Sequence, residues 1–359
     1  MVIALLGGIM PAAASSAPAP VQESGTSTVL AADSPDVASL LSGLRSAGQA
    51  VVDRLSAAVT PSGSSLTLGS DGRLTFLLVG SDYRPGYTDE RLDVILVVSI
   101  DTSTGKVVAA SIPRDTVQFP RAPSNGGGTS GNERVNYMLE DYSGTLTTKL
   151  QKFTKDVSFA LGVEIDHYGY LQFTGFDHLM VALGGVTVNI AQPITDKNYN
   201  DYGSPPFGIH FPAASSYYLG GPYGALCPDW HSNCHRAQPY VRSRHGKVGN
   251  AANNDWKRNA RQQQVVMAAM QQVTSGHLSA LVNAANAGMT NGLTTDVAIS
   301  LANARQLYNW VHDATFSHQV IFQPNTWETH HQGTPAYTYT LRLSKVRAWI
   351  HQYMPALTP

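Results

Sequence analysis

The sequence has 359 residues, of which 43% are hydrophobic and 14% are charged, and its formal net charge at pH 7 is −1. This length suits one large domain or two ordinary ones, and the composition excludes an intrinsically disordered chain. The small net charge excludes the strongly basic surface of a general nucleic-acid-binding protein. Sixteen arginines against eight lysines favour planar, bidentate binding of phosphate or carboxylate groups.

The N-terminal residues 1–36 have the character of a targeting segment. The apolar run Val2–Met10 is shorter than the about 20 residues that a membrane-spanning helix needs. The small residues "AAAS" that follow it are typical of a signal-cleavage site. We interpret residues 1–36 as a signal peptide or a truncated membrane anchor, followed by a disordered linker rich in Ala, Ser, Pro and Thr. Both interpretations place the protein outside the cytoplasm; the alternatives are a disordered apolar tail and a start codon assigned too late.

An accessory helix and a short linker are predicted at residues 37–68. Apolar residues recur there at three- and four-residue steps, until "PSGSS" ends the pattern. Three apolar runs then predict strands that are covered on both faces, as in a layered α/β domain: Leu74–Gly80, Asp93–Ile100 and Lys106–Ile112. The turn "DTSTG" predicts that the second and third of these strands form a hairpin.

The rest of the chain, up to residue 359, continues the same domain. Helical periodicity predicts helices at Thr145–Val163, Asn259–Val273 and Leu343–Met354. Strands are predicted at His167–Phe173 and Gly184–Ile190. No internal repeat or second domain boundary interrupts residues 69–359.

A stretch rich in Tyr, Pro and Gly at about residues 198–236 is interpreted as an inserted loop, and it contains both cysteines. In an exported protein, Cys227 and Cys234 favour a disulfide that closes the small loop "CPDWHSNC". One alternative is a zinc site formed with His231 and His235, although this spacing fits no common zinc motif. The other alternative is two free thiols.

Charged residues gather at one end of the three predicted strands. The first strand ends, and the second begins, in "GSDYR" and "ERLD", and the hairpin returns the end of the third strand to the start of the second. We therefore expect one edge of the sheet to carry three aspartates and three arginines. These residues are Asp82, Arg84, Arg91, Asp93, Arg114 and Asp115.

This edge is interpreted as a site for a metal ion and a diphosphate. A single Arg–Asp pair often only neutralises itself, but desolvating the whole group is costly unless it binds a ligand. Asp82 and Asp93 are hard oxygen ligands suited to Mg²⁺, or to Mn²⁺ in its place. Arg84, Arg91 and Arg114 are suited to phosphate oxygens.

A second basic group lies downstream in "YVRSRHGKVGNAANNDWKRNARQQQ". Two of its arginines alternate as on an extended segment, and the others lie on one face near the start of a helix, where backbone N–H groups favour anions. We expect Asp255 to be the N-cap of that helix. The alternatives are a solvated face and a nucleic-acid site, and the scarcity of aromatic residues argues against nucleic acid. The residues of this group are Arg242, Arg244, Arg258, Arg261 and Gln262.

In this order the motifs "LLVGSDYR", "ERLDVILVVSID", "SIPRDT", "GFDHLMVALGGVTV", "YVRSRH" and "DWKRNARQQQ" resemble the LytR-CpsA-Psr family, from about residue 74 to residue 270. The resemblance implies a three-layer α/β/α fold with a central mixed β-sheet and an apolar polyprenyl-binding pocket. It also implies a membrane-anchored, outward-facing phosphotransferase. Such an enzyme moves a glycopolymer, such as a teichoic acid, from a polyprenyl-diphosphate carrier onto peptidoglycan in the cell wall.

The same resemblance implies roles for individual residues. Asp82 and Asp93 would hold the metal. From their chemistry rather than from the resemblance, Asp82 and Asp115 are the candidates to accept a proton, although metal ligation competes for Asp82. With Arg91 and Arg114, these two acids form the expected catalytic group. The residues expected to contact the diphosphate are Arg84, Arg91, Arg114, Arg242, Arg244, Arg258, Arg261 and Gln262. Asp115 and Arg84 have the least defined roles, and Arg261 has an alternative role in orienting the helix end.

Two other functions remain open from the sequence. One is an exported hydrolase that cleaves polyprenyl or sugar diphosphates with water, which would need no peptidoglycan acceptor. The other is a non-catalytic module that binds polyprenyl lipid or glycan. The intact pair Asp82 and Asp93, together with the arginines, argues against such a module.

Overall fold

The computed structural model describes residues 65–83, 90–200, 207–220, 227, 229, 231–273, 278–289, 292–324, 326–331 and 337–355. The predicted targeting segment and nearly all of the accessory helix and linker lie outside these residues, as does Arg84. The chain separates into two compact units, and the described residues belong to the one that holds residues 63–359. None of the helices among the described residues is both long enough and apolar enough to cross a bilayer.

A six-stranded mixed sheet forms the centre of this unit, in the order β12-β5-β2-β3-β4-β13. Strands β2, β3 and β4 pair antiparallel, whereas β5 pairs parallel with β2 and β13 pairs parallel with β4. The predicted hairpin of the second and third strands is therefore present. The strands are β2 (Leu74–Ser81), β3 (Leu92–Asp101), β4 (Lys106–Ser111), β5 (His167–Gln172), β12 (Leu293–Thr295) and β13 (Thr315–Ile321).

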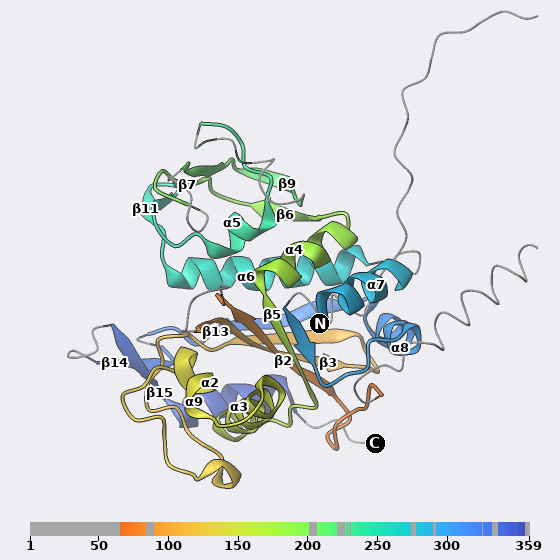
Figure 1. Ribbon diagram of the computed structural model, residues 1–359. Coiled ribbons are helices and arrows are strands. Elements are labelled where there is room, and N and C mark those ends of the chain that lie inside the picture. The colour runs from red at the N-terminus through yellow and green to blue at the C-terminus, as the bar shows by residue number, and fades with distance from the viewer. Residues whose placement is uncertain are drawn as a thin grey trace, which may run out of the picture. The chain divides into compact units, whose positions relative to one another are not determined.

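Helices cover both faces of this sheet (Figure 1). Because side chains alternate along a strand, Leu74 and Phe76 of β2 enter one core, and Leu77 and Val79 enter the other. The first core is completed by α4 (Phe173–Ala182), α6 (Asp255–Gln272), α7 (Leu278–Met289) and α8 (Leu301–Val311). The second is completed by α2 (Met138–Asp141), α3 (Leu146–Leu161) and α9 (Leu343–Tyr353). This arrangement confirms the expected three-layer α/β/α fold.

Helix α6 carries much of the predicted second basic group. Its N-cap is Asn254, whose side chain accepts a hydrogen bond from the Lys257 backbone N–H at 3.0 Å. The prediction that Asp255 is the N-cap is therefore wrong by one residue. Asn caps a helix as well as Asp does, and the Asp255 carboxylate instead faces Arg258 one turn later.

The stretch at residues 198–236 is not a plain loop, which corrects the sequence interpretation. It contains two strands, in which Ile209, Phe211, Tyr217 and Leu219 are buried at alternate positions. These runs are only three and six residues long, and the surrounding Gly and Pro conceal their alternation. The strands of this region are β6 (Val186–Ile190), β7 (Ile194–Asp196), β8 (Ile209–Phe211), β9 (Ala214–Leu219), β10 (Lys247–Val248) and β11 (Ala251–Ala252).

Two further strands, β14 (Glu328–His331) and β15 (Thr338–Leu341), pair antiparallel near the C-terminus. They bring residues of the tail against the segment that follows β4, since the Val117 backbone N–H donates to the Tyr339 carbonyl at 2.7 Å. The sequence predicts neither strand.

The turn before β10 requires glycine. Gly246 has φ of +73°, and a Cβ added there would lie 2.1 Å from the Thr195 carbonyl oxygen of β7. This close approach fixes the segment that follows Arg244 against β7.

We expect Gly246→Ala to lower the free energy of unfolding by about 3 kcal/mol, because the positive φ and the backbone clash both oppose a Cβ. Gly127→Ala is the matched control, since Gly127 has φ of +67° and nothing within 4 Å of the added atom. We expect Gly127→Ala to lower the free energy of unfolding, measured by urea unfolding, by about 1 kcal/mol. Equal losses in the two variants would contradict the proposed backbone constraint.

Candidate active site

One partly buried carboxylate joins three segments that are distant in sequence. Asp93 lies near the start of β3, Arg114 in the loop after β4, and Arg258 in the first turn of α6. Asp93 Oδ1 accepts from Arg114 Nη1, and Asp93 Oδ2 accepts from Arg258 Nη1 at 3.0 Å. The Arg258 side chain is only 2% exposed. The sequence predicted that Arg114 lies near Asp93, and this prediction is confirmed.

Two more carboxylates extend this ion-pair network. Asp255 Oδ1 lies 2.8 Å from Arg258 Nη2 and 3.7 Å from Arg114 Nε. Asp115 Oδ1 lies 3.3 Å from Arg134 Nε. Arg134 was not predicted from the sequence, and Asp255 was predicted only as a helix cap. The contacts of Arg134 with Asp115 and of Asp255 with Arg114 join residues far apart in the chain, so no local pattern marks them. The i,i+3 spacing of Asp255 and Arg258 was the local signal available for that ion pair.

The charges of the network set its protonation states. Burial would raise the pKa of Asp93, but the guanidinium groups of Arg258, Arg114 and Arg244 hold it at about 2. The carboxylate is therefore ionised at neutral pH. Desolvation lowers the pKa of the Arg244 guanidinium, the nearby charges of Arg114 and Arg258 lower it further, and the carboxylates of Asp93 and Asp255 partly offset this effect. Positive charge is thus concentrated around Arg244, which favours binding of an anion there.

The ends of β2 and β3 hold a second part of the site. The Arg91 backbone N–H donates to Asp82 Oδ1 at 3.1 Å, and the Asp82 N–H donates to the Arg91 carbonyl at 3.0 Å. The Arg91 guanidinium lies 5.3 Å from the centre of the Tyr137 ring. Glu90, which the sequence analysis did not select, accepts from Ser81 Oγ at 2.9 Å. Burial is the main cause that raises the pKa of Glu90.

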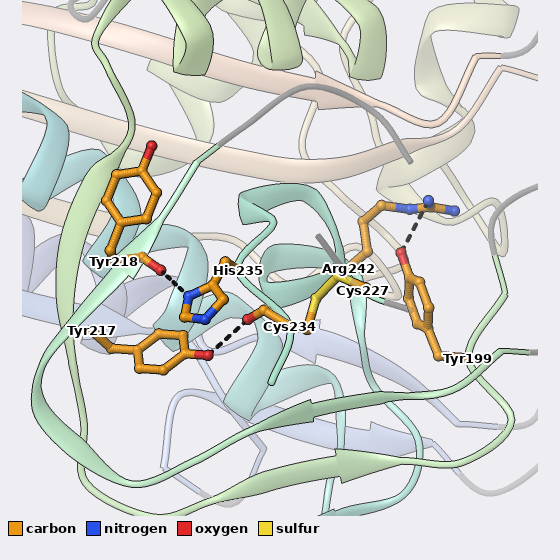
Figure 2. The surroundings of a disulfide bond; sticks show 7 residues. All are labelled: Tyr199, Tyr217, Tyr218, Cys227, Cys234, His235 and Arg242. Carbon is orange, nitrogen blue, oxygen red and sulfur yellow. Dashed lines mark hydrogen bonds between the residues drawn. A yellow bond between two sulfur atoms is a disulfide. The ribbon is translucent and has the colours of Figure 1, made fainter. Parts of the chain in front are cut away.

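Arg242 and Arg244 are not on an extended segment, and that prediction is wrong. Arg242 is the last residue of helix α5 (Ala237–Arg242), and Arg244 lies beyond it. Pro239 concealed the helix in the sequence, although proline is tolerated in a first helical turn. Arg242 Nη1 donates to Tyr199 Oη at 3.2 Å, and its guanidinium lies 4.4 Å from the centre of the Phe173 ring. Figure 2 shows the contact of Arg242 with Tyr199.

The Arg261 guanidinium donates hydrogen bonds to acceptors within the protein. Nε donates to the Tyr240 carbonyl at 2.7 Å, Nη1 to Asn253 Oδ1 at 3.3 Å and Nη2 to the Ser243 carbonyl. Arg261 therefore ties the end of α5 and the following segment to α6. This geometry favours the positioning role over the predicted direct contact with diphosphate. Gln262 donates to the Val241 carbonyl at 3.2 Å.

An apolar pocket opens beside the charged network, between the sheet and helices α4, α5 and α6. Asp93, Arg242 and Gln262 belong to its wall, so Asp93 is a member of both the pocket wall and the ion-pair network. Most of the wall is apolar. Its apolar residues include Leu78, Leu96, Leu171, Phe176, Val265 and Val266.

Cys227 and Cys234 form a disulfide, which is the pairing favoured from the sequence (Figure 2). Both sulfur atoms are thereby unavailable to the alternative zinc site. The Cys234 carbonyl accepts from Tyr217 Oη at 3.1 Å, and the Tyr217 ring stacks on His235 with centroids 4.9 Å apart. The disulfide belongs to the same hydrophobic core as Tyr240 of α5, the helix that ends at Arg242.

The donor chemistry of Asp82 and Asp93 fits Mg²⁺, which takes one or two carboxylates together with phosphate oxygens and water. Asp93 is ionised, as a metal ligand must be. Each of its oxygens accepts from one arginine and keeps a second lone pair that could ligate a cation. Within the described ranges, no three His, Cys, Asp or Glu side chains are grouped to hold a metal ion. Substrate oxygens would therefore have to complete the ligand set.

The fold and this site define an α/β/α protein with an arginine–carboxylate network at an apolar pocket. The chain belongs to the LytR_cpsA_psr family, because the profile of that family matches residues 45–340. This match confirms the resemblance inferred from the sequence motifs.

Curated relatives agree with this assignment. The cell wall biosynthesis protein LcpA of Corynebacterium glutamicum is 28% identical over 279 residues, which are 67% of this chain and 48% of LcpA. The polyisoprenyl-teichoic acid–peptidoglycan teichoic acid transferase TagU of Oceanobacillus iheyensis is 32% identical over 129 residues, which are 35% of this chain and 37% of TagU. The matches span less than half the length of these relatives.

Solved structures support the fold. The match to Bacillus subtilis TagV covers 81% of this chain and 100% of TagV. Its TM-score is 0.53, and the sequence identity is 19%. The match to the protein gbs0355 of Streptococcus agalactiae covers 80% of this chain and 89% of gbs0355. Its TM-score is 0.55, and the sequence identity is 18%. At these identities the similarity shows a shared fold.

We expect Asp93→Asn to lower the free energy of unfolding by about 3 kcal/mol, because it removes the carboxylate that accepts from both the buried Arg258 and the partly buried Arg114 and leaves Asp255 as their remaining shared anion. Urea unfolding at pH 7 measures this loss. Asp313→Asn is the control, since the Asp313 side chain is 89% exposed and should change stability by less than about 0.5 kcal/mol. A loss at Asp93 as small as that at Asp313 would contradict the bridging role.

Acid should weaken the same bridge. The folded-state pKa of Asp93, about 2, lies below its ordinary value of 3.8. The ionised carboxylate therefore contributes to the free energy of unfolding above pH 4, and this contribution is lost as pH falls toward 2. We expect the wild type to lose about 2 kcal/mol more than Asp93→Asn between pH 5 and pH 2. Parallel stability curves for the two proteins would argue against a lowered pKa.

Proposed function

We propose that this protein is a Mg²⁺-dependent phosphotransferase that moves a glycopolymer from a polyprenyl-diphosphate carrier onto peptidoglycan. The observation that carries the proposal is the junction of an apolar pocket with a largely buried arginine–carboxylate network at Asp93. A carrier of this kind has the same two parts, an apolar chain and a charged diphosphate. The relatives named as a cell wall biosynthesis protein and as a teichoic acid transferase support the choice of substrate.

In this proposal the polyprenyl chain lies in the pocket, against residues such as Leu78, Phe176 and Val265. Removing that apolar surface from water provides most of the binding free energy. The diphosphate lies at the polar end, where Arg114, Arg244 and Arg258 concentrate positive charge. Guanidinium groups bind phosphate oxygens through parallel N–H···O contacts, which also orient the diphosphate for reaction.

The reaction is a displacement at phosphorus. A peptidoglycan sugar hydroxyl attacks the sugar-side phosphorus, its O–P bond forms, and the bond from this phosphorus to the bridging oxygen breaks. Polyprenyl phosphate leaves with the electron pair of that bond. Arg114 and Arg258 stabilise the charge that develops on the leaving group, and positioning supplies much of the rate. Held by Asp82 and Asp93, Mg²⁺ would neutralise further diphosphate charge.

Of the two predicted bases, Asp115 fits the role better than Asp82. Burial raises the pKa of Asp115, which makes its carboxylate a stronger proton acceptor near neutral pH. Asp82 is the expected metal ligand, and a bound cation would lower its basicity. The proton of the attacking hydroxyl would therefore pass to Asp115.

The proposal also places the catalytic domain outside the cytoplasm, at the membrane surface where a polyprenyl carrier and peptidoglycan meet. The Cys227–Cys234 disulfide supports this location, because disulfides persist in oxidising compartments.

A turnover assay tests the proposal. The full-length protein is mixed with a short polyprenyl-diphosphate saccharide, Mg²⁺ and a peptidoglycan fragment, and mass spectrometry follows both products. We expect Arg114→Ala to reduce transfer by at least about 100-fold, because it removes a donor to the developing charge. Arg305→Ala, at an exposed position on α8, should retain full activity. Circular dichroism verifies that both variants are folded.

Three results would contradict the proposal in distinguishable ways. Release of polyprenyl phosphate without attachment of the saccharide would indicate a hydrolase. Binding of the lipid without turnover would indicate a binding module. Equal activity of Arg114→Ala and the wild type would place the chemistry elsewhere.

A further inference from the structure

A fully buried glutamate lies behind the loop that carries Arg114 and Asp115. Glu328, the first residue of β14, is 0% exposed, and so is Thr116, whose hydroxyl oxygen lies 2.7 Å from Glu328 Oε1. Glu328 Oε2 has no hydrogen-bond partner among the residues that the structure describes. No Lys, Arg or His side chain within those residues pairs with Glu328. A buried carboxylate without a cation is costly, so this environment favours the neutral form.

The hydrogen-bond geometry around Thr116 points to the same form. Thr116 Oγ1 lies 2.7 Å from both the Pro113 carbonyl oxygen and Glu328 Oε1. A threonine hydroxyl has one hydrogen, and a carbonyl oxygen or an ionised carboxylate can only accept. If Glu328 is ionised, one of these two short contacts has no hydrogen. If Glu328 is protonated, its O–H donates to Thr116 and the Thr116 O–H donates to Pro113, so both contacts are hydrogen bonds.

The hairpin that carries Glu328 contacts two parts of the candidate active site. The Tyr339 N–H of β15 donates to the Asp115 carbonyl at 3.3 Å, and the Val117 N–H donates to the Tyr339 carbonyl at 2.7 Å. The Tyr339 ring packs edge-on against Trp256 in the first turn of α6, with centroids 5.5 Å apart. The hairpin therefore touches both the loop of Arg114 and the helix turn of Arg258.

The titratable groups that face Glu328 are Asp115, from the loop after β4, and Tyr339, from β15. Neither brings a positive charge. Burial raises the pKa of Glu328 to about 8, and the negative charge of Asp115 acts in the same direction, whereas the contact with the Thr116 hydroxyl acts in the opposite direction. A charge on Glu328 would in turn repel Asp115, the carboxylate that pairs with Arg134.

We propose that Glu328 is a positioning residue whose protonated carboxyl, through the Thr116 hydroxyl, holds the Arg114–Asp115 loop in its ligand-binding geometry. Ionisation of Glu328 removes the donor to Thr116 and places a second negative charge behind Asp115. The loop then loses its buried anchor, and Arg114 loses its fixed position. The inference rests on the proposed function only for the identity of the ligand that this loop binds.

The pH dependence of stability tests the protonated state without any ligand. A glutamate whose folded-state pKa is raised from 4.5 to about 8 stabilises the fold fully below pH 4.5, and this contribution is lost as pH rises to 8. Glu328→Gln keeps the shape and a donor to Thr116 but does not titrate. We expect the folding equilibrium constant of the wild type, relative to Glu328→Gln, to fall about tenfold per pH unit between pH 5.5 and 7.5. A ratio that is independent of pH would overturn the proposal.

Substitutions at Thr116 test the hydrogen-bonded link with a matched pair. Thr116→Val keeps the shape and removes the hydroxyl, whereas Thr116→Ser keeps the hydroxyl. We expect Thr116→Val to lower the folding equilibrium constant at pH 6 by about 10-fold to 100-fold, because it leaves a buried carboxyl without a partner. Thr116→Ser should retain most of the stability. Equal effects of the two substitutions would contradict a role for the hydroxyl.

Binding of farnesyl diphosphate, measured by calorimetry at pH 6.5 and pH 9, tests the effect on the site. We expect the wild type to lose about tenfold more affinity than Glu328→Gln over this range, because only the protonated form is competent. Equal losses would mean that Glu328 does not position the loop. If no variant binds the probe, the proposed function fails, and the stability series still decides the state of Glu328.

Discussion

The bridge that Asp93 makes between Arg114 and Arg258 is the interaction on which the rest of the site depends. It fixes the start of β3, the loop after β4 and the first turn of α6 to one carboxylate. Such a buried set is stable only when every charge has a partner, so the loss of one member disturbs the others. Asp255 and Asp115 complete the set from the helix turn and from the loop. The site is therefore assembled by electrostatic pairing between elements that the sheet and α6 first bring together.

The apolar core and the charged network meet because α6 serves both. Its later turns place Val265 and Ala269 in the core over the sheet, and its first turn places Arg258 beside Asp93. The pocket wall passes from Val265 to Gln262 and then to Asp93, which is a short path from an apolar to a charged surface. A ligand with only one of these characters would leave half of the site unmatched. This is the physical reason for proposing an amphiphilic diphosphate as the ligand of the site. The disulfide and Arg261 stabilise α5, which carries Arg242, and the segment that follows it.

The central strands could be predicted because a strand buried on both faces produces a continuous apolar run, and one short turn fixed the pairing of β3 with β4. That pairing alone predicted that Arg114 lies near Asp93. Residues whose partners come from other elements left no local signal. The contacts of Arg134 with Asp115, of Asp255 with Arg114 and of Glu328 with Thr116 depend on a loop, a helix start and a C-terminal hairpin meeting in space. Helix α5 was missed because Pro239 and two alternating arginines imitate an extended segment, and β8 and β9 because their alternation is short.

A crystal structure of the full-length protein with farnesyl diphosphate would test the central claim most directly. The account predicts that the farnesyl chain occupies the pocket lined by Leu78, Phe176 and Val265, and that the diphosphate oxygens contact Arg114, Arg244 or Arg258. A farnesyl chain outside this pocket would contradict the account. So would a diphosphate held away from these arginines, because the pocket and the ion-pair network would then not form one binding site.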